Sequence, residues 1–153
     1  MAETHQLFCT FYLDGHFFGV EVEKVQEVLR YQEMTRIPLA PDVVTGLINL
    51  RGQIVTAVDL RRRLQFEDRQ SDKQPMNVVI HAEGGAVSLL VDEIGDVLDT
   101  TEESFEESPE TVQGVARELV RGVHKLKDNL LLILDTEKAI QMQPNGQDRT
   151  QGD

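Results

Sequence analysis

The sequence contains one cysteine, no tryptophan and few aromatic side chains of any kind. Cys9 alone cannot form an intramolecular disulfide and has no partner cysteine for a metal-binding knuckle, which predicts a reducing compartment. With two tyrosines and six phenylalanines, the core must be built mainly from valine, leucine and isoleucine, and this favours β-structure. The 153 residues, 40% hydrophobic and 27% charged, have the length and composition of one globular domain.

Cations are scarce as well. The chain has 27 acidic against 15 basic residues and a formal net charge of -12. Residues 83–116 contain ten Asp and Glu side chains and neither Lys nor Arg. A nucleic-acid-binding protein needs cations that displace the counterions of the phosphates. The charge balance therefore argues against that class and favours a protein or basic partner.

Long hydrophobic runs are also missing. The longest aliphatic stretch, residues 130–134, is far shorter than the roughly 20 apolar residues of a membrane-spanning helix. The first residues, MAETHQLF, lack the basic start and apolar run of a signal peptide. We therefore expect a cytoplasmic protein with no direct membrane insertion.

Motifs that carry catalysis are absent from the sequence. It has no nucleophile elbow, no P-loop and no dinucleotide-binding glycine motif. The histidines are scattered without a second His or Cys at metal-ligand spacing, so we expect no metal and no cofactor; they are His5, His16, His81 and His124. A small hydrolase using Asp59 or Asp135 with a histidine is the remaining enzyme hypothesis, although both aspartates are better interpreted as helix N-caps.

Two further features have simple structural interpretations. The acidic run at 99–110 lacks the alternating carboxylates and central glycine of an EF-hand, so we interpret it as a solvated loop. Cys9 alternates with Leu7, Phe11 and Leu13 on one face of an expected strand. We therefore predict a buried, unreactive Cys9 that packs as a small hydrophobic residue.

What the sequence does have is four pairs of strand-like segments around turn dipeptides, which indicate hairpins. The pairs are 7–13 with 17–22, 46–50 with 54–58, 77–82 with 86–91, and 122–126 with 130–134. Their turns lie at Asp14-Gly15, Arg51-Gly52, Glu83-Gly84-Gly85 and Asp128-Asn129. Residues 130–134 do not alternate, so this strand is expected to be covered on both faces.

Helical signals are short. Val25, Val28 and Leu29 lie at i, i+3 and i+4, which predicts a helix over 23–30. Segments 59–64 and 135–140 each begin with Asp and allow about two helical turns. Residues 65–75 have the composition of a polar linker, and 143–153 that of a disordered tail.

The two halves of the chain also resemble each other. Residues 12–29 align with 81–98 at a constant shift of 69, and residues 46–60 align with 122–136 at a shift of 76. The second alignment matches Arg51 to Lys127 and Asp59 to Asp135. A lobe of about 60 residues is marginally stable alone, because it buries only about 60% of its unfolded surface. We therefore expect two similar β-lobes that share a core.

The arginines allow two interpretations each. Arg51 is either a solvated residue at a hairpin tip or a planar fork that recognises a carboxylate or amide of a partner. A turn of this kind more commonly has Asn or Asp before glycine, while Lys127 keeps a positive charge at the equivalent tip. Arg61, Arg62 and Arg63 are either a basic recognition patch or a surface paired with nearby acids.

Four segments resemble the CheW family of bacterial chemotaxis coupling proteins: 24–38, 46–61, 89–99 and 121–140. The resemblance runs from residue 6 to residue 142 in the order and spacing of the family. It implies a mainly β fold of two five-stranded, SH3-like barrel lobes packed together, with a few short helices. We place lobe one at 14–72 and lobe two at 76–142, and leave open a crossing of the first and last segments between the lobes.

The resemblance implies an adaptor without catalytic activity, a monomer when isolated. Its implied partners are the cytoplasmic tip of methyl-accepting chemoreceptors and the regulatory domain of a CheA-type histidine kinase, so the protein would be recruited to membrane receptor arrays. Thr56-Ala57 and His124 depart from the common family pattern. They leave open a paralogue serving pili or gliding, or a scaffold that occupies receptors without activating the kinase.

The resemblance also implies binding residues around a receptor-binding groove. By motif these are Val25, Glu27, Gly46, Arg51 and Val97. Apolar Val25 and Val97 occupy corresponding segments of the two halves and suit a partner helix as anchors. Both valines could equally belong to the core.

Overall fold

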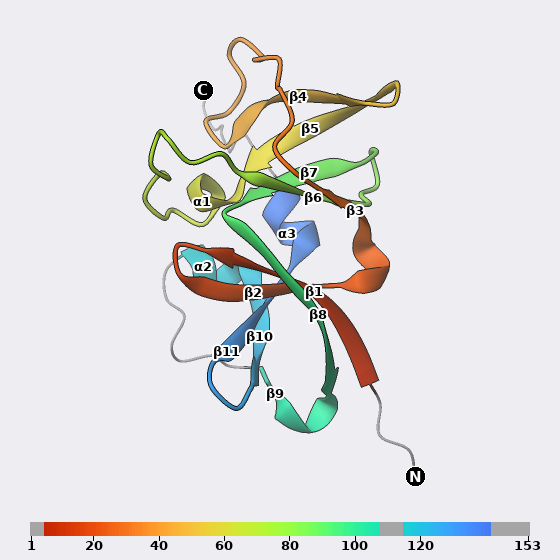
Figure 1. The fold of residues 1–153 in the computed structure, drawn as a ribbon, viewed down its shortest axis with the longest axis vertical. Helices are drawn as coiled ribbons and strands as arrows, with labels where there is room; N and C mark the ends of the chain where they lie inside the picture. The colour runs from red at the N-terminus through yellow and green to blue at the C-terminus, as the bar shows by residue number, and fades with distance from the viewer. Residues whose placement is uncertain (1–4, 108–114, 142–153) are drawn as a thin grey trace, which may run out of the picture.

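The computed structural model describes residues 5–107 and 115–141, and they form eleven strands with short helical segments (Figure 1). The strands of the first half are β1 (His5–Leu13), β2 (His16–Glu21), β3 (Val25–Leu29), β4 (Val44–Leu50) and β5 (Gln53–Asp59). Those of the second half are β6 (Met76–Ile80), β7 (Val87–Val91), β8 (Glu93–Thr101), β9 (Phe105–Glu106), β10 (Val120–Lys125) and β11 (Leu130–Leu134). The helices are α1 (Leu60–Arg63), α2 (Val115–Leu119) and α3 (Thr136–Ile140), with 3₁₀ turns η1 (Val22–Lys24) and η2 (Glu102–Ser104).

The strands form two sheets with matching topology. One sheet has the order β3-β6-β7-β5-β4, and the other has the order β8-β1-β2-β11-β10-β9. Apart from the two-residue β9, each strand of one sheet corresponds to a strand of the other under the sequence repeat. In both sheets the two hairpins meet through a parallel pair, β5 with β7 and β2 with β11. The predicted hairpins and two-lobe, SH3-like architecture are therefore confirmed.

The division of the chain between the sheets differs from the expected one. After β2 the chain crosses to the other sheet, where β3 pairs with β6; after β7 it crosses back, and β8 pairs with β1. One lobe thus contains the strands of 25–91, and the other contains those of 5–21 and 93–134. The lobes expected over 14–72 and 76–142 do not match the sheets, because each sheet takes one hairpin from the other half of the repeat: β6-β7 joins β3, β4 and β5, and β1-β2 joins β8, β10 and β11.

The helix expected over 23–30 is wrong. Only Val22–Lys24 forms a 3₁₀ turn, and β3 follows as a strand. A bulge between Val25 and Glu27 changes the register against β6. Val25 consequently packs on one apolar cluster and Leu29 on another. The i, i+3, i+4 spacing of apolar residues therefore comes from a bulged strand and only looks like the stripe of a helix. The strand is favoured because pairing with β6 satisfies its backbone, whereas an isolated two-turn helix is marginal.

The other two predicted helices are confirmed. α1 follows Asp59, whose side chain accepts a hydrogen bond from the backbone N–H of Arg61. α3 follows Asp135, whose side chain accepts one from the backbone N–H of Lys138. Both aspartates therefore act as N-caps, as the sequence indicated.

The main apolar cluster belongs to both lobes. It contains side chains of β1, β2, β10 and β11 from one sheet and of β5, β6 and β7 from the other. β11 is covered on both faces as predicted, since Leu132 packs in this shared cluster while Leu131 packs inside its own lobe. The lobes share a core, so neither completes its apolar packing alone.

β1 does not keep a single buried face. Phe11 and Leu13 are buried as expected, but Phe8 is buried too, while Leu7 is half-exposed and Cys9 only partly buried. A bulge against β8 between Cys9 and Phe11 shifts the alternation, and β1 contacts apolar clusters on both sides. Burial raises the pKa of the Cys9 thiol, which keeps it in the less reactive protonated form.

Two polar segments are more ordered than expected. Residues 99–107 of the acidic run continue β8 and form η2 and β9 instead of a solvated loop, while 108–110 lie outside the described residues. In the expected linker at 65–75, the side chain of Arg69 is largely buried in ion pairs. The expected tail at 143–153 lies outside the described residues. Across the described part of the chain, no helix has the length and apolar character needed to span a bilayer.

Candidate functional site

The hairpin tip between β4 and β5 holds Arg51 in an unusual backbone conformation. Arg51 and Gly52 have φ values of 52° and 89°, so both are left-handed, as in a type I′ turn. Asn49 braces the turn by accepting a hydrogen bond of 2.9 Å from the Gly52 N–H. Asn or Asp suits the position of Arg51 better than Arg does. The turn alone therefore does not explain the choice of arginine.

The Arg51 side chain is engaged with β3. Its Nη2 donates to Oε2 of Glu27, and the side chain of Arg51 remains 69% exposed while that of Glu27 is 22% exposed. Beside this pair, Gln26 donates to Gln53 at 3.4 Å. β3 and β4 are the two edges of the sheet β3-β6-β7-β5-β4, so these contacts close that lobe through side chains. Glu27 thus favours one orientation of the exposed fork of Arg51.

The two expected valine anchors lie in different environments. Val25 is partly buried and packs against the shared core, which agrees with the core alternative. Val97 on β8 is 57% exposed, so that alternative is wrong for this residue. The structure places Val97 in the other lobe from Glu27 and Arg51.

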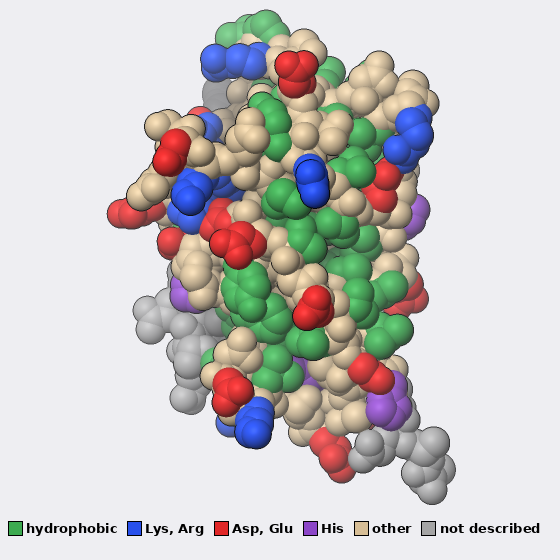
Figure 2. All heavy atoms as spheres, viewed as in Figure 1, with side chains coloured by type: hydrophobic (Ala, Val, Ile, Leu, Met, Phe, Trp, Pro, Cys, Tyr) green, Lys and Arg blue, Asp and Glu red, His purple; other side chains and the backbone are tan. Residues whose placement is uncertain are grey.

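Sequence reasoning missed Val28. It is 39% exposed on β3, pairs with Val78, and corresponds to Val97 under the shift of 69. Val97 pairs with Cys9, and the same shift relates Cys9 to Val78. Val28 and Val97 therefore lie in matching environments. Applying the repeat to Val97 would have identified Val28. Figure 2 shows hydrophobic side chains gathered on the face where Figure 1 draws β1, β3 and β8.

Gly46 has a steric role. It is buried on β4, and a Cβ atom built on it would lie 2.6 Å from the backbone oxygen of Thr35. Thr35 and Leu47 exchange two backbone hydrogen bonds of 2.8 Å. Gly46 therefore allows the segment before β4 to lie against the strand, and a binding role for it stays a prediction.

The three consecutive arginines are all engaged, which favours the paired alternative over a recognition patch. Arg61 Nη2 lies 2.6 Å from Asp92 Oδ2, and Arg62 contacts Asp42 and Asp68. Arg63 donates to backbone carbonyls at the end of α3. These contacts fix α1 to its surroundings, with Arg61 and Arg62 paired to carboxylates and Arg63 bound to carbonyl groups.

Asp92 lies where the chain crosses from β7 to β8. It contacts Arg61 and Arg69 and accepts a hydrogen bond of 2.8 Å from the backbone N–H of Asp14. Burial acts to raise the pKa of Asp92, but the hydrogen bonds from Arg61 and Asp14 and the two guanidinium charges outweigh it and lower that pKa. The carboxylate therefore stays ionised and joins the crossing between β7 and β8 to Arg61, Arg69 and the turn at Asp14.

Among the described residues, no hydrogen bond or ion pair joins Asp59 or Asp135 to a histidine. Asp59 and Asp135 cap helices, and Asp59 also contacts Arg69. His124 is buried between Phe8 and Phe105, where Nδ1 lies 2.7 Å from the Ser104 hydroxyl. Within 5–107 and 115–141, no group of three His, Cys, Asp or Glu side chains is placed to hold a metal ion.

Comparison with known proteins agrees with this architecture. The family model for the CheW-like domain matches residues 7–143. The Chemotaxis protein CheW of Klebsiella aerogenes is 33% identical over 135 residues, covering 88% of this chain and 81% of that protein. The Chemotaxis protein CheW of Bacillus subtilis is 28% identical over 138 residues, covering 90% and 88%.

The solved structures include a close match in fold. The crystal structure of the scaffolding protein TtCheW from Thermoanaerobacter tengcongensis superimposes with a TM-score of 0.82 at 26% identity, covering 92% of this chain and 95% of that one. The matched residues span both sheets and the two crossings between them. This chain belongs to the CheW-like family.

Proposed function

We propose that the protein is a non-enzymatic adaptor that couples chemoreceptor cytoplasmic tips to a CheA-type histidine kinase in bacterial chemotaxis. Membership of the CheW-like family supports this role, as do relatives named as chemotaxis and scaffolding proteins. The protein works in the cytoplasm and is recruited to membrane receptor arrays. It needs no cofactor, because its task is to hold two proteins together.

The observation that carries the proposal is the fork of Arg51 held out from the hairpin tip by Glu27. A planar guanidinium whose orientation is already favoured recognises a carboxylate or amide with less further loss of side-chain entropy. The exposed valines, Val28 and Val97, supply apolar anchors on the strands β3 and β8. An amphipathic helix of a receptor tip, with one apolar stripe and polar flanks, suits such a surface.

An adaptor also needs a surface for its second partner. A groove of about 910 Å³ lies between β5, the turn joining β6 to β7, and α3. Ile54 lines this groove and is 59% exposed, while Val87 and Ile140 add apolar surface. We assign this groove to the regulatory domain of the kinase, since it offers apolar side chains and neither Val28 nor Val97 lines it.

Binding of the purified protein to a receptor-tip fragment and to the kinase regulatory domain tests the proposal. We expect the wild type to bind both and Arg51→Glu to lose receptor binding while remaining folded. Lys127→Glu, at the equivalent tip of the other lobe, is the matched control and should bind as the wild type does. If the wild type binds neither partner, the adaptor function is wrong. If Arg51→Glu binds both normally, only the role of Arg51 is wrong.

A further inference from the structure

The structure assigns Arg30 and Asp99 as a pair of opposite charges that orients the bound receptor helix. This inference rests on the proposed function and adds to it a direction of binding. It starts from the repeat, because a shift of 69 relates Val28 to Val97 and Arg30 to Asp99. The two lobes therefore present the same apolar position followed, two residues later, by a charge of opposite sign.

The strand geometry places each charge beside its valine. Side chains two residues apart along a strand point to the same face. Val97 and Asp99 both lie on β8, while Val28 lies on β3 and Arg30 directly follows the last residue of that strand. Val97 pairs with Cys9 and Asp99 with Leu7, so in this lobe the carboxylate adjoins an exposed apolar patch. Val28 and Arg30 are both exposed in the other lobe.

Arg30 has a fixed backbone and a free side chain. Its carbonyl accepts hydrogen bonds of 3.0 Å from Asn77 and 3.2 Å from Gln32. Asn77 is completely buried and is itself held by a hydrogen bond of 2.7 Å from Ser88. This buried network fixes the point from which the Arg30 side chain leaves the strand.

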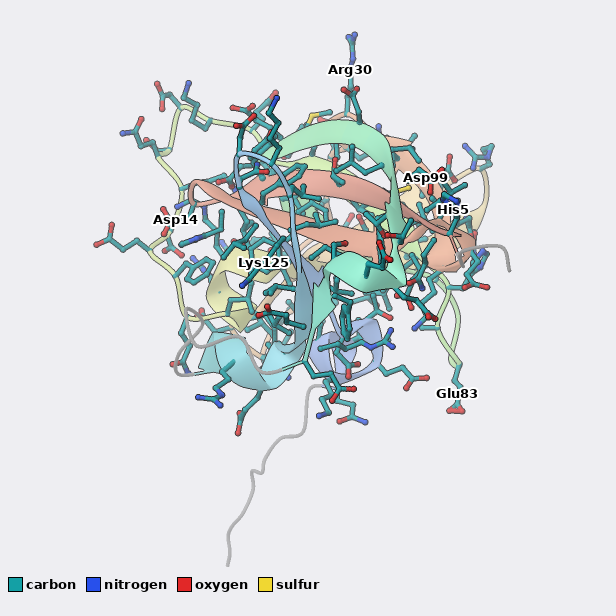
Figure 3. The ribbon with its side chains drawn as sticks, turned by 90° about the horizontal axis from the view of Figure 1, so that it is seen from below. His5, Asp14, Arg30, Glu83, Asp99 and Lys125 are labelled. Carbon is teal, nitrogen blue, oxygen red and sulfur yellow. The ribbon has the colours of Figure 1, made fainter. Side chains whose placement is uncertain are left out.

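The guanidinium of Arg30 has no carboxylate partner among the described residues. Several other arginines do: Arg51, Arg61, Arg62, Arg69 and Arg121. Figure 3 shows the Arg30 side chain standing away from the strands, on the side that Figures 1 and 2 present to the viewer. An unpaired, pre-positioned cation in a chain of net charge -12 is suited to a partner's carboxylate.

Asp99 provides the negative charge of the pair. Its side chain is 56% exposed and its Oδ1 lies 2.8 Å from His5 Nδ1, which Figure 3 shows beside it. His5 is equally exposed, so a Lys or Arg of the partner can reach the carboxylate and replace this contact. A helix lying across both lobes would place a carboxylate near Arg30 and a cation near Asp99. The reversed helix would bring like charges together at both ends.

The test measures the affinity of the full chain for a soluble chemoreceptor-tip fragment by calorimetry at low and high salt. We expect Arg30→Glu and Asp99→Lys each to lower the affinity about tenfold, with a smaller loss at high salt. Arg36→Glu and Glu103→Lys change the net charge equally at exposed positions outside β3 and β8, and should stay within about twofold of the wild type. Thermal denaturation checks that every variant is folded.

A charge scan of the receptor fragment then tests the direction. One Asp or Glu replaced by Lys should restore binding to Arg30→Glu, and one Lys or Arg replaced by Glu, at the other end of the contact, should restore binding to Asp99→Lys. Equal losses in the control variants, unchanged affinity of Arg30→Glu, or the absence of any rescuing position would overturn the inference. Failure of the wild type to bind would instead refute the proposed function.

Discussion

Replacing Arg51 with Asn separates what the hairpin needs from what a partner needs. At φ 52° an L-residue other than Gly, Asn or Asp stores about 1 kcal/mol of backbone strain, which Asn relieves. The same change removes the ion pair with Glu27. That pair contributes about 0.2–1 kcal/mol, because the Arg51 side chain is 69% exposed and screened by solvent. The two effects nearly cancel, so we expect the free energy of unfolding to change by less than about 1 kcal/mol.

Binding should respond differently. Arg51→Asn removes the guanidinium fork, and we expect the affinity for the receptor-tip fragment to fall about tenfold or more, as for a charged interface residue. Urea denaturation gives the stability and calorimetry gives the affinity. A Glu27→Gln variant, which keeps the turn unchanged, completes a double-mutant cycle and measures the coupling between the two side chains. A free energy of unfolding lowered by more than about 2 kcal/mol, or an unchanged affinity, would refute the reasoning.

Three other predictions concern single positions. Leu39 is fully exposed with φ 65°, so Leu39→Asn should stabilise the protein by about 1 kcal/mol, seen as a rise of about 2–4 °C in Tm; a lower Tm would contradict the strain argument. Ile54→Asp should weaken binding of the kinase regulatory domain and leave receptor binding intact, and equal loss of both partners would show that the groove is misassigned. Burial lowers the pKa of His124, so the stability that neutral His124 contributes should be present above about pH 6.5 and decline as pH falls through its folded pKa. Denaturation of His124→Phe between pH 7 and pH 5 should show a flatter dependence, and an unchanged slope would assign the effect elsewhere.

The sequence predicted local structure well where the signal itself is local. Hairpins follow from turn residues such as Asp14-Gly15, and the caps of α1 and α3 follow from Asp59 and Asp135, since each depends on contacts within a few residues. The repeat also gave the correspondence of the strands. The helix expected over 23–30 failed because its apolar spacing arises from a bulged strand whose partner lies about fifty residues later, at β6.

The candidate site was only partly accessible from the sequence. Glu27 and Arg51 lie 24 positions apart, and their contact depends on β3 and β4 meeting as opposite edges of one sheet. Only the structure shows which expected valine anchor is exposed. Val25 packs on the shared core and Val97 faces solvent, although their segments look alike in the sequence. The positions of Val28 and Arg30 follow from the repeat once Val97 and Asp99 are known to be exposed.

The exchange of hairpins between the two halves of the chain has a mechanical consequence. Two domains joined by one linker can swing about it and absorb a partner's movement. Here the chain passes between the lobes at both η1 and Asp92, and the apolar cluster beneath them belongs to both sheets. Two separated connections resist twisting as well as bending. A displacement of a receptor helix against one lobe would therefore reach a kinase bound elsewhere on the protein as movement of a stiff body, with little lost inside the adaptor.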